Sequence, residues 1–116
     1  MRKIIADTHA HTIVSGHAYS TIREMASAAK RRGIQVQALT EHAPKMPGTC
    51  GLYYFQNLDV IPREMDGVRM LFGAELNIMD PEGKMWIFRK EYARNWIWRS
   101  QVCIFRVLAR EEVRMR

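Results

Sequence analysis

The order of strand, helix and strand near the start of the chain restricts the folds that it can adopt. Residues 3–8 form a short apolar run that predicts a strand. Thr21 and Glu24 form a capping-box pattern, and apolar residues then recur at helical spacing until a glycine, so we expect a helix over residues 21–32. Residues 34–40 predict a second strand. Two strands joined by one helix pair in parallel, which predicts an α/β fold.

Later segments predict fewer elements. Residues 68–73 are expected to form a third strand. The stretch 53–65 is compatible with a short helix that ends before Pro62, and residues 80–83 have the composition of a turn.

Each predicted strand is followed by a side chain that can bind a metal ion. His9 and His11 follow the first strand, His42 follows the second and Glu75 follows the third. Side chains two residues apart on a strand project to the same face, so His9 and His11 can approach one ion. The carboxyl ends of parallel strands form one rim, where such groups can hold divalent ions, activate water and bind a phosphoryl group. Taken singly, these residues are also compatible with ordinary hydrogen-bonded histidines and a solvated carboxylate.

Four ordered motifs resemble the PHP (polymerase and histidinol phosphatase) family, and within it the YcdX-like bacterial phosphatases. They are Asp-Thr-His-Ala-His-Thr at 7–12, Ser-Gly-His-Ala-Tyr-Ser-Thr at 15–21, Leu-Thr-Glu-His at 39–42 and Gly-Ala-Glu-Leu-Asn at 73–77. The resemblance spans about residues 4–84, so it concerns the N-terminal part of the chain.

The resemblance implies a distorted TIM-like (β/α) barrel with a trinuclear cluster of divalent metal, zinc or manganese, at the carboxyl rim. By resemblance, His9 and His11 bind one metal, Glu75 bridges it to a second, and His17 and His42 serve the third. The implied activity is metal-dependent hydrolysis of a phosphate ester of a small molecule, with no separate side-chain nucleophile.

Two further residues are expected to support these ligands by hydrogen bonds rather than bind metal themselves. They are Asp7 and Glu41. The family usually has aspartate at the position of Glu41, and the longer side chain changes the geometry expected there.

The chain is shorter than a barrel of this kind, which has roughly 250 residues. No histidine follows His42, so we expect that one copy of the chain cannot complete the cluster. The predicted fold is therefore an incomplete barrel with an exposed sheet edge and marginal stability. We expect an inactive or incomplete phosphatase, whose activity would need ligands from a second copy or fragment. The alternatives are a non-catalytic half-domain that binds metal or a partner, and a histidinol-phosphatase-like activity.

A change in composition predicts a boundary after residue 85. Residues 1–85 carry 10 basic and 9 acidic side chains, whereas residues 86–116 carry 8 basic and 3 acidic ones. Residues 86–116 also contain all three tryptophans of the chain, at positions 86, 96 and 98. We therefore interpret residues 1–85 as a partial PHP domain and residues 86–116 as an aberrant, non-homologous basic tail.

The codons of this tail are compatible with a frameshift. Trp86 is encoded by TGG and the next codon begins with AT, so skipping two bases gives aspartate. From Ile97 to Ile104 the same shifted frame permits Leu-Ala-Val-Ala-Ser-Leu-His, which resembles a family strand ending in a metal-binding histidine. An alternative is that the basic and aromatic side chains of the tail bind nucleic acid or an anionic membrane. We favour the frameshift and expect neither of those partners.

The remaining composition limits the class of protein. No apolar run reaches the roughly 18 residues that a membrane-spanning helix requires, and the first residues do not resemble a secretory signal. Cys50 and Cys103 lack the paired spacing of a zinc ribbon or a disulfide framework. We therefore expect a cytoplasmic protein of undetermined oligomeric state.

Overall fold

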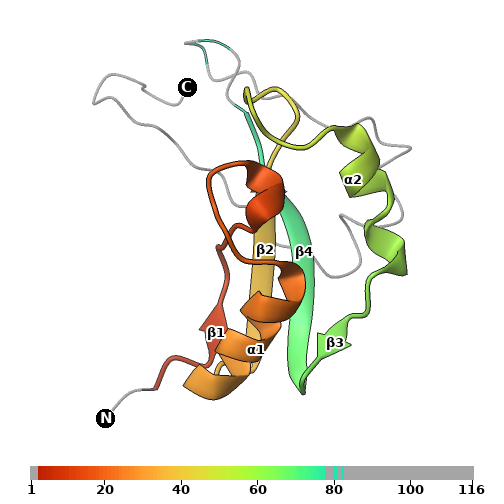
Figure 1. Cartoon of the computed structure of the whole chain (residues 1–116). Helices are drawn as coiled ribbons and strands as arrows, with labels where there is room; N and C mark the ends of the chain where they lie inside the picture. The colour runs from red at the N-terminus through yellow and green to blue at the C-terminus, as the bar shows by residue number, and fades with distance from the viewer. Residues whose placement is uncertain (1–2, 78–79, 81, 83–116) are drawn as a thin grey trace.

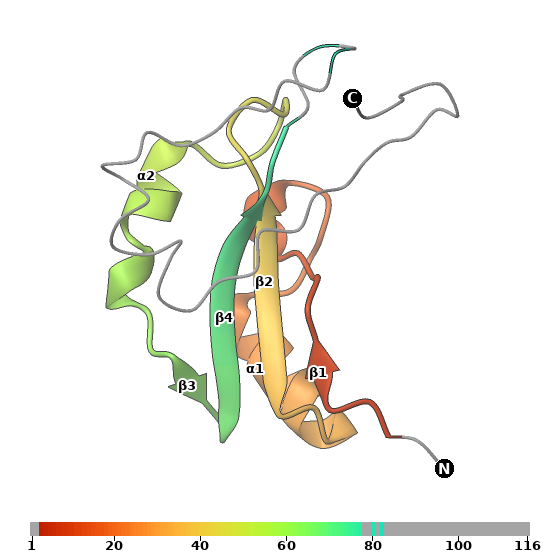
Figure 2. The ribbon, with the colours of Figure 1, turned by 180° about the vertical axis from the view of Figure 1, so that it is seen from behind.

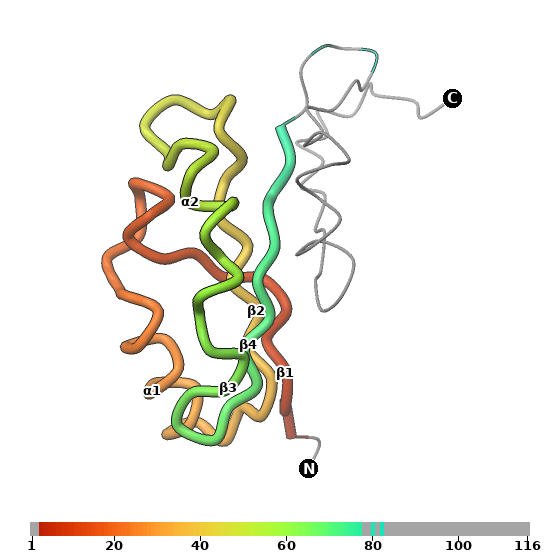
Figure 3. Tube along the Cα trace, turned by 90° about the vertical axis from the view of Figure 1, so that its right-hand side faces the viewer, coloured from red at the N-terminus to blue at the C-terminus, as the bar shows by residue number. Residues whose placement is uncertain are grey.

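The computed structural model describes residues 3–77, 80 and 82, and this part of the chain is a mixed α/β structure. One four-stranded sheet has the order β1-β2-β4-β3. Both helices lie on the same side of the sheet (Figure 3). The strands are β1 (Ala6–Asp7), β2 (Val36–His42), β3 (Glu64–Met65) and β4 (Val68–Glu75), the helices are α1 (Ile22–Arg32) and α2 (Leu52–Gln56), and the 3₁₀ helices are η1 (Ile13–Ser15) and η2 (Leu58–Val60).

The parallel pairing predicted from the element order is confirmed. Strand β2 pairs in parallel with β1 on one side and with β4 on the other (Figure 1). Seen from behind, β2 and β4 are long neighbouring strands, whereas β1 and β3 are short (Figure 2). All three parallel strands therefore present their carboxyl ends at one edge of the sheet.

Helix α1 begins and ends where the sequence predicts. The Thr21 hydroxyl accepts the N–H of Glu24, and the Glu24 carboxylate accepts the N–H of Thr21 at 2.6 Å. Gly33 ends the helix in the left-handed region, with φ of 71°. Ala26 and Ala29 are buried on the face that packs against the core. Small side chains on this face let the helix approach the sheet closely.

The strand boundaries differ from those predicted. The predicted strand at 3–8 is reduced to β1, because only Ala6 and Asp7 pair with β2. Strands β2 and β4 extend beyond the predicted residues 40 and 73, because the parallel ladder continues until His42 pairs with Glu75. The paired strands therefore hold two candidate ligands, His42 and Glu75, within their hydrogen-bonded backbone.

The expectation of a short helix before Pro62 within residues 53–65 is confirmed, but the stretch contains further elements. This stretch contains most of α2, all of η2 and strand β3, which pairs antiparallel with β4. Asp66 and Gly67 join β3 to β4 in a tight turn, with φ of 54° and 78°. An Asp-Gly pair is a strong signal for such a hairpin, and it was present in the sequence.

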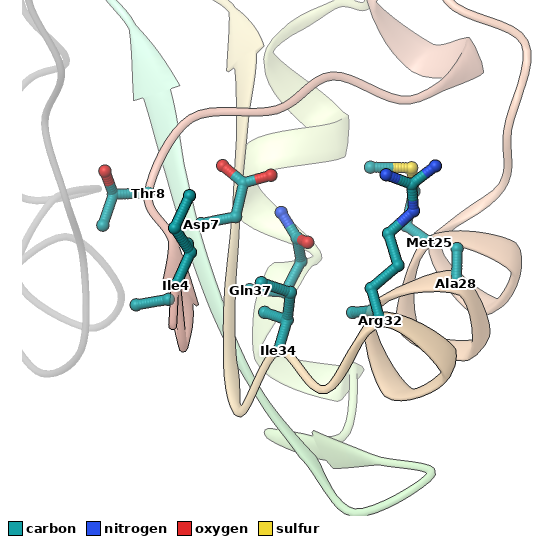
Figure 4. Close-up of a pocket in the computed structure, with 10 residues that line it drawn as sticks. Ile4, Asp7, Thr8, Met25, Ala28, Arg32, Ile34 and Gln37 are labelled. Atoms are coloured by element: carbon teal, nitrogen blue, oxygen red, sulfur yellow. The ribbon is translucent and has the colours of Figure 1, made fainter. Parts of the chain in front are cut away.

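A groove of about 530 Å³ lies between β1 and α1. Figure 4 shows Asp7 and Gln37 on its sheet side and Arg32 on its helix side. Ile4 of the adjacent chain segment also lines the groove and is 74% exposed.

Several predictions concern residues outside the part that the structure describes. They are the turn at 80–83, except for Asp80 and Glu82, the boundary after residue 85, the basic tail at 86–116 with its frameshift, and Cys103. Within residues 3–77, 80 and 82, no helix combines the length and the apolar character needed to cross a bilayer.

Candidate metal centre

The strand ends bring the predicted ligands together at one edge of the sheet. His42 and Glu75 are paired neighbours on β2 and β4. Alternation along β2 places Thr40 and His42 on one face and Glu41 on the other. His9 and His11 follow β1, and His17 lies just after the left-handed Gly16 that ends η1.

Three ligand atoms form a compact triangle. His9 Nε2 lies 3.1 Å from His11 Nε2, and Glu75 Oε2 lies 3.3 Å from the former and 3.1 Å from the latter. Ligands bound tetrahedrally to zinc at 2.0–2.1 Å are about 3.3 Å from one another. The triangle therefore has the edge length of a face of a zinc coordination tetrahedron.

The carboxylate oxygen in this triangle is buried and has no hydrogen-bond partner among the described residues. Glu75 Oε2 is inaccessible to solvent, and His42 Nδ1 approaches it at 3.7 Å in addition to the two Nε2 atoms. An unpaired buried carboxylate oxygen is unfavourable, and a cation among these nitrogen and oxygen lone pairs would remove that cost. The donor set fits a divalent metal.

A second group of ligand atoms shares one residue with the first. His11, His17 and His42 have ring nitrogens within 4.8 Å of one another, as do the ligand atoms of His9, His11 and Glu75. The rings of His11 and His42 are stacked, with centroids 4.5 Å apart. The structure thus brings all five predicted ligands into two adjoining groups with His11 in common.

Burial controls the protonation of the shared histidine. The pKa of His11 is lowered from its ordinary value of 6.5, mainly by burial and then by the neighbouring His42, while Glu75 opposes the shift. His11 is therefore neutral near pH 7, and one ring nitrogen keeps a lone pair for a ligand.

Glu41 lies on the opposite face of β2 and is fully buried. Both of its carboxylate oxygens accept the N–H of Thr12 at 3.1 Å, and Oε1 also accepts the Thr12 hydroxyl at 2.6 Å. Oε2 accepts the Ser15 hydroxyl at 2.5 Å. Ser15 Oγ in turn lies 3.0 Å from His11 Nδ1. Glu41 therefore reaches a candidate ligand through a hydroxyl group rather than directly.

Hydroxyl groups near the ligands were missed by the sequence reasoning. Besides Thr12 and Ser15, Thr40 Oγ1 lies 3.3 Å from His9 Nδ1. These residues belong to the same short motifs as the histidines, and this proximity was the available signal. Asp7, which was predicted to support a ligand, accepts the backbone N–H of His9 at 3.1 Å and also lines the groove beside α1.

A close backbone contact fixes the loop that carries His17. Gly16 has φ of 78°, and a Cβ atom there would lie 2.2 Å from the carbonyl oxygen of Gly48. Only glycine satisfies both conditions, so Gly16 allows the His17 loop to pack against the loop after His42.

The charge of Glu41 acts on two other side chains, Tyr54 and Cys50. The Tyr54 hydroxyl is buried without a hydrogen-bond partner among the described residues, and burial raises the pKa of its phenol. Burial likewise raises the pKa of the Cys50 thiol, which is not in a disulfide. A protonated thiol is a poor nucleophile and a poor metal ligand, in agreement with the absence of a metal-binding spacing around Cys50.

The described part of the chain is thus an α/β domain with a candidate metal centre at the carboxyl ends of its parallel strands. The family model for the PHP domain matches residues 7–108. The chain belongs to the PHP domain family.

Curated relatives match the N-terminal part of the chain. A protein of Thermoanaerobacter sp. (strain X514) named as a probable phosphatase is 54% identical over 83 residues, which are 72% of this chain and 34% of the relative. Probable phosphatases of Acetivibrio thermocellus and Photobacterium profundum are 54% and 49% identical over 81 and 83 residues, or 70% and 72% of this chain and 34% of each relative. The chain spans about a third of the length of these relatives.

Proposed function

We propose that this chain is part of a metal-dependent phosphoesterase that hydrolyses a phosphorylated small molecule. The main support is the buried Glu75 Oε2, which has no hydrogen bond within the described part of the chain and lies within 3.1–3.7 Å of three imidazole nitrogens. The names of the relatives, which are probable phosphatases, support the same reaction class. A cytoplasmic location belongs to the same proposal.

In this proposal the five clustered side chains hold zinc or manganese. His9, His11 and Glu75 form one set, and His17 and His42 join His11 in the adjoining set. Divalent ions held there supply a Lewis acid that activates water and neutralises phosphate oxygens. No side-chain nucleophile is required.

The roles of the protein groups follow from their surroundings. Burial keeps His11 neutral and able to donate a lone pair near pH 7. His9 is more exposed, with 36% of its side chain accessible, so it lies on the side from which a phosphate ester would approach. His17 is also exposed and adds a ligand to the group of His11 and His42.

Whether this chain alone can hydrolyse a substrate depends on how many metal ligands it supplies. A trinuclear cluster needs more ligands than the five proposed here, and residues 86–116 contain no histidine. We therefore propose that residues 1–116 bind metal but do not turn over substrate by themselves, and that the further ligands come from outside these residues. A non-catalytic half-domain that binds metal is the second candidate, because each of the two groups already offers three ligand atoms from this chain.

Metal binding and hydrolysis should be measured on the same preparation. The full chain is titrated with zinc and with manganese by calorimetry, and hydrolysis of p-nitrophenyl phosphate is followed with each metal. The His9→Ala variant removes one ligand, and Tyr19→Phe is the control because Tyr19 is 92% exposed and contributes no ligand atom to either group.

Binding that is lost in His9→Ala but kept in Tyr19→Phe supports the proposed site. Turnover that His9→Ala abolishes would make the single chain an active phosphatase and would overturn the proposed need for additional ligands. Absence of any metal binding by the folded wild-type chain would refute the proposal.

A further inference from the structure

The Ser15 hydroxyl takes part in three hydrogen bonds beside the candidate metal centre. Ser15 is 3% exposed. Its Oγ accepts the backbone N–H of His42 at 3.0 Å, contacts Glu41 Oε2 at 2.5 Å and lies 3.0 Å from His11 Nδ1. A hydroxyl group has one proton to donate, so the two side-chain contacts cannot both receive it.

The surroundings of Glu41 determine which contact receives the proton. The carboxylate already accepts the N–H and the hydroxyl of Thr12. The Thr12 hydroxyl accepts the N–H of Val14 at 3.3 Å and donates its own proton to Glu41 Oε1. A carboxylate only accepts, and a 2.5 Å contact has the length of a charge-assisted O–H···O⁻ bond. The Ser15 proton therefore goes to Glu41.

The remaining contact of Ser15 then has only one possible direction. With its proton donated to Glu41, Ser15 Oγ can only accept from His11, so His11 carries its proton on Nδ1. The other nitrogen, Nε2, keeps its lone pair and lies 3.1 Å from Glu75 Oε2. This is the tautomer needed to bind a metal within the triangle described above.

We propose that Ser15 is a positioning residue, oriented by Glu41, that fixes His11 as the Nδ1–H tautomer and directs its Nε2 lone pair into the metal centre. This inference rests on the proposed function in one respect, namely that the directed Nε2 lone pair serves to bind a metal. The tautomer itself is a property of the metal-free chain.

A parallel contact at the neighbouring histidine provides an internal control. Thr40 Oγ1 lies 3.4 Å from the carbonyl oxygen of Ala10 and 3.3 Å from His9 Nδ1. Thr40→Val removes this hydroxyl with little change in shape. It should alter His9 and leave the tautomer of His11 unchanged.

The tautomers can be read directly by NMR. The full chain has four histidines, so ¹⁵N-histidine labelling gives four ring systems in a long-range ¹H–¹⁵N correlation spectrum. Spectra are recorded on metal-free protein above the ordinary His pKa, and His11→Gln identifies the His11 signals. We expect His11 as the Nδ1–H tautomer in the wild type and in Thr40→Val.

Two variants reverse or remove the hydrogen bond. In Glu41→Gln, an amide NH₂ at the position of Oε2 donates to Ser15, whose proton then turns to His11 Nδ1. His11 should therefore change to the Nε2–H tautomer, and its zinc affinity should fall by about 10–100-fold, as for other partners of metal ligands. Ser15→Ala removes the acceptor and should also lose the Nδ1–H preference. Glu41→Asp keeps an acceptor-only carboxylate and should retain it.

The proposal is overturned if wild-type His11 is the Nε2–H tautomer, or if its tautomer stays the same in the folded Glu41→Gln and Ser15→Ala variants. If neither variant folds by circular dichroism, the wild-type spectrum still decides between the two tautomers. Failure of the wild type to bind zinc, with His11 as Nδ1–H, would refute the proposed function and leave the role of Ser15 supported.

Discussion

Replacing Glu41 by alanine should destabilise the described domain strongly, although Glu41 contributes no ligand atom to either group. The change removes the acceptor of three donors, which are the N–H and hydroxyl of Thr12 and the hydroxyl of Ser15. The Ser15 hydroxyl can rotate to His11 Nδ1 at 3.0 Å, so two buried donors at Thr12 remain unpaired. At about 1–3 kcal/mol each, and with water regaining part of this energy, we expect a loss of about 2–4 kcal/mol in the free energy of unfolding.

Urea denaturation followed by circular dichroism measures this effect. With a slope of about 1–3 kcal/mol per molar urea, the midpoint should fall by about 1–2 M, or the variant should be unfolded without urea. Glu24→Ala is the matched control, because Glu24 accepts one backbone N–H at the exposed start of α1. Its midpoint should fall much less. Equal shifts in the two variants would refute the argument that the buried carboxylate holds the segment that carries Ser15.

The remaining predictions concern the ligands, the response to pH and the loop geometry. Glu75→Gln should reduce zinc affinity by more than about 100-fold in calorimetry, because losing a metal ligand should cost more than the roughly 10–100-fold cost of losing a hydrogen-bond partner of a ligand. Unchanged affinity would exclude Glu75 as a ligand. Burial lowers the pKa of His11 in the folded chain, so the unfolded chain takes up a proton first as the pH falls. The stability associated with His11 is therefore fully present above pH 6.5 and is lost as the pH falls from there towards the lower folded-state pKa. The drop in urea midpoint between about pH 7.5 and about pH 5.5 should be smaller in His11→Gln, and an equal drop would contradict this. Gly16→Ala and Gly67→Ala both place a Cβ at φ of 78°, but only the former meets a loop carbonyl oxygen, at 2.2 Å. Gly16→Ala should therefore cost more stability in urea and also weaken metal binding, and equal effects would show that the loop contact is unimportant.

Local sequence patterns were sufficient to predict the elements whose bounds depend on interactions between residues close in the sequence. The capping box of Thr21 and Glu24 and the glycine after residue 32 predicted α1 to within one residue, because caps act through hydrogen bonds inside the element. The order of strand, helix and strand predicted the parallel pairing of β1 and β2. Strand lengths were less predictable, since they depend on how far the partner strand continues. The hairpin at Asp66 and Gly67 was predictable from its dipeptide and was missed.

The sequence by itself placed His9, His11, His42 and Glu75 after predicted strands, because residue chemistry and strand alternation are local properties. The resemblance to the PHP family added His17 to these candidate ligands. Only the tertiary structure decided how these side chains are grouped and that Glu75 Oε2 is buried without a hydrogen bond from any described residue. It also placed Ser15 between Glu41 and His11. Strand alternation turns Glu41 away from the ligands, and contacts between residues 26 positions apart arise only when the chain has folded.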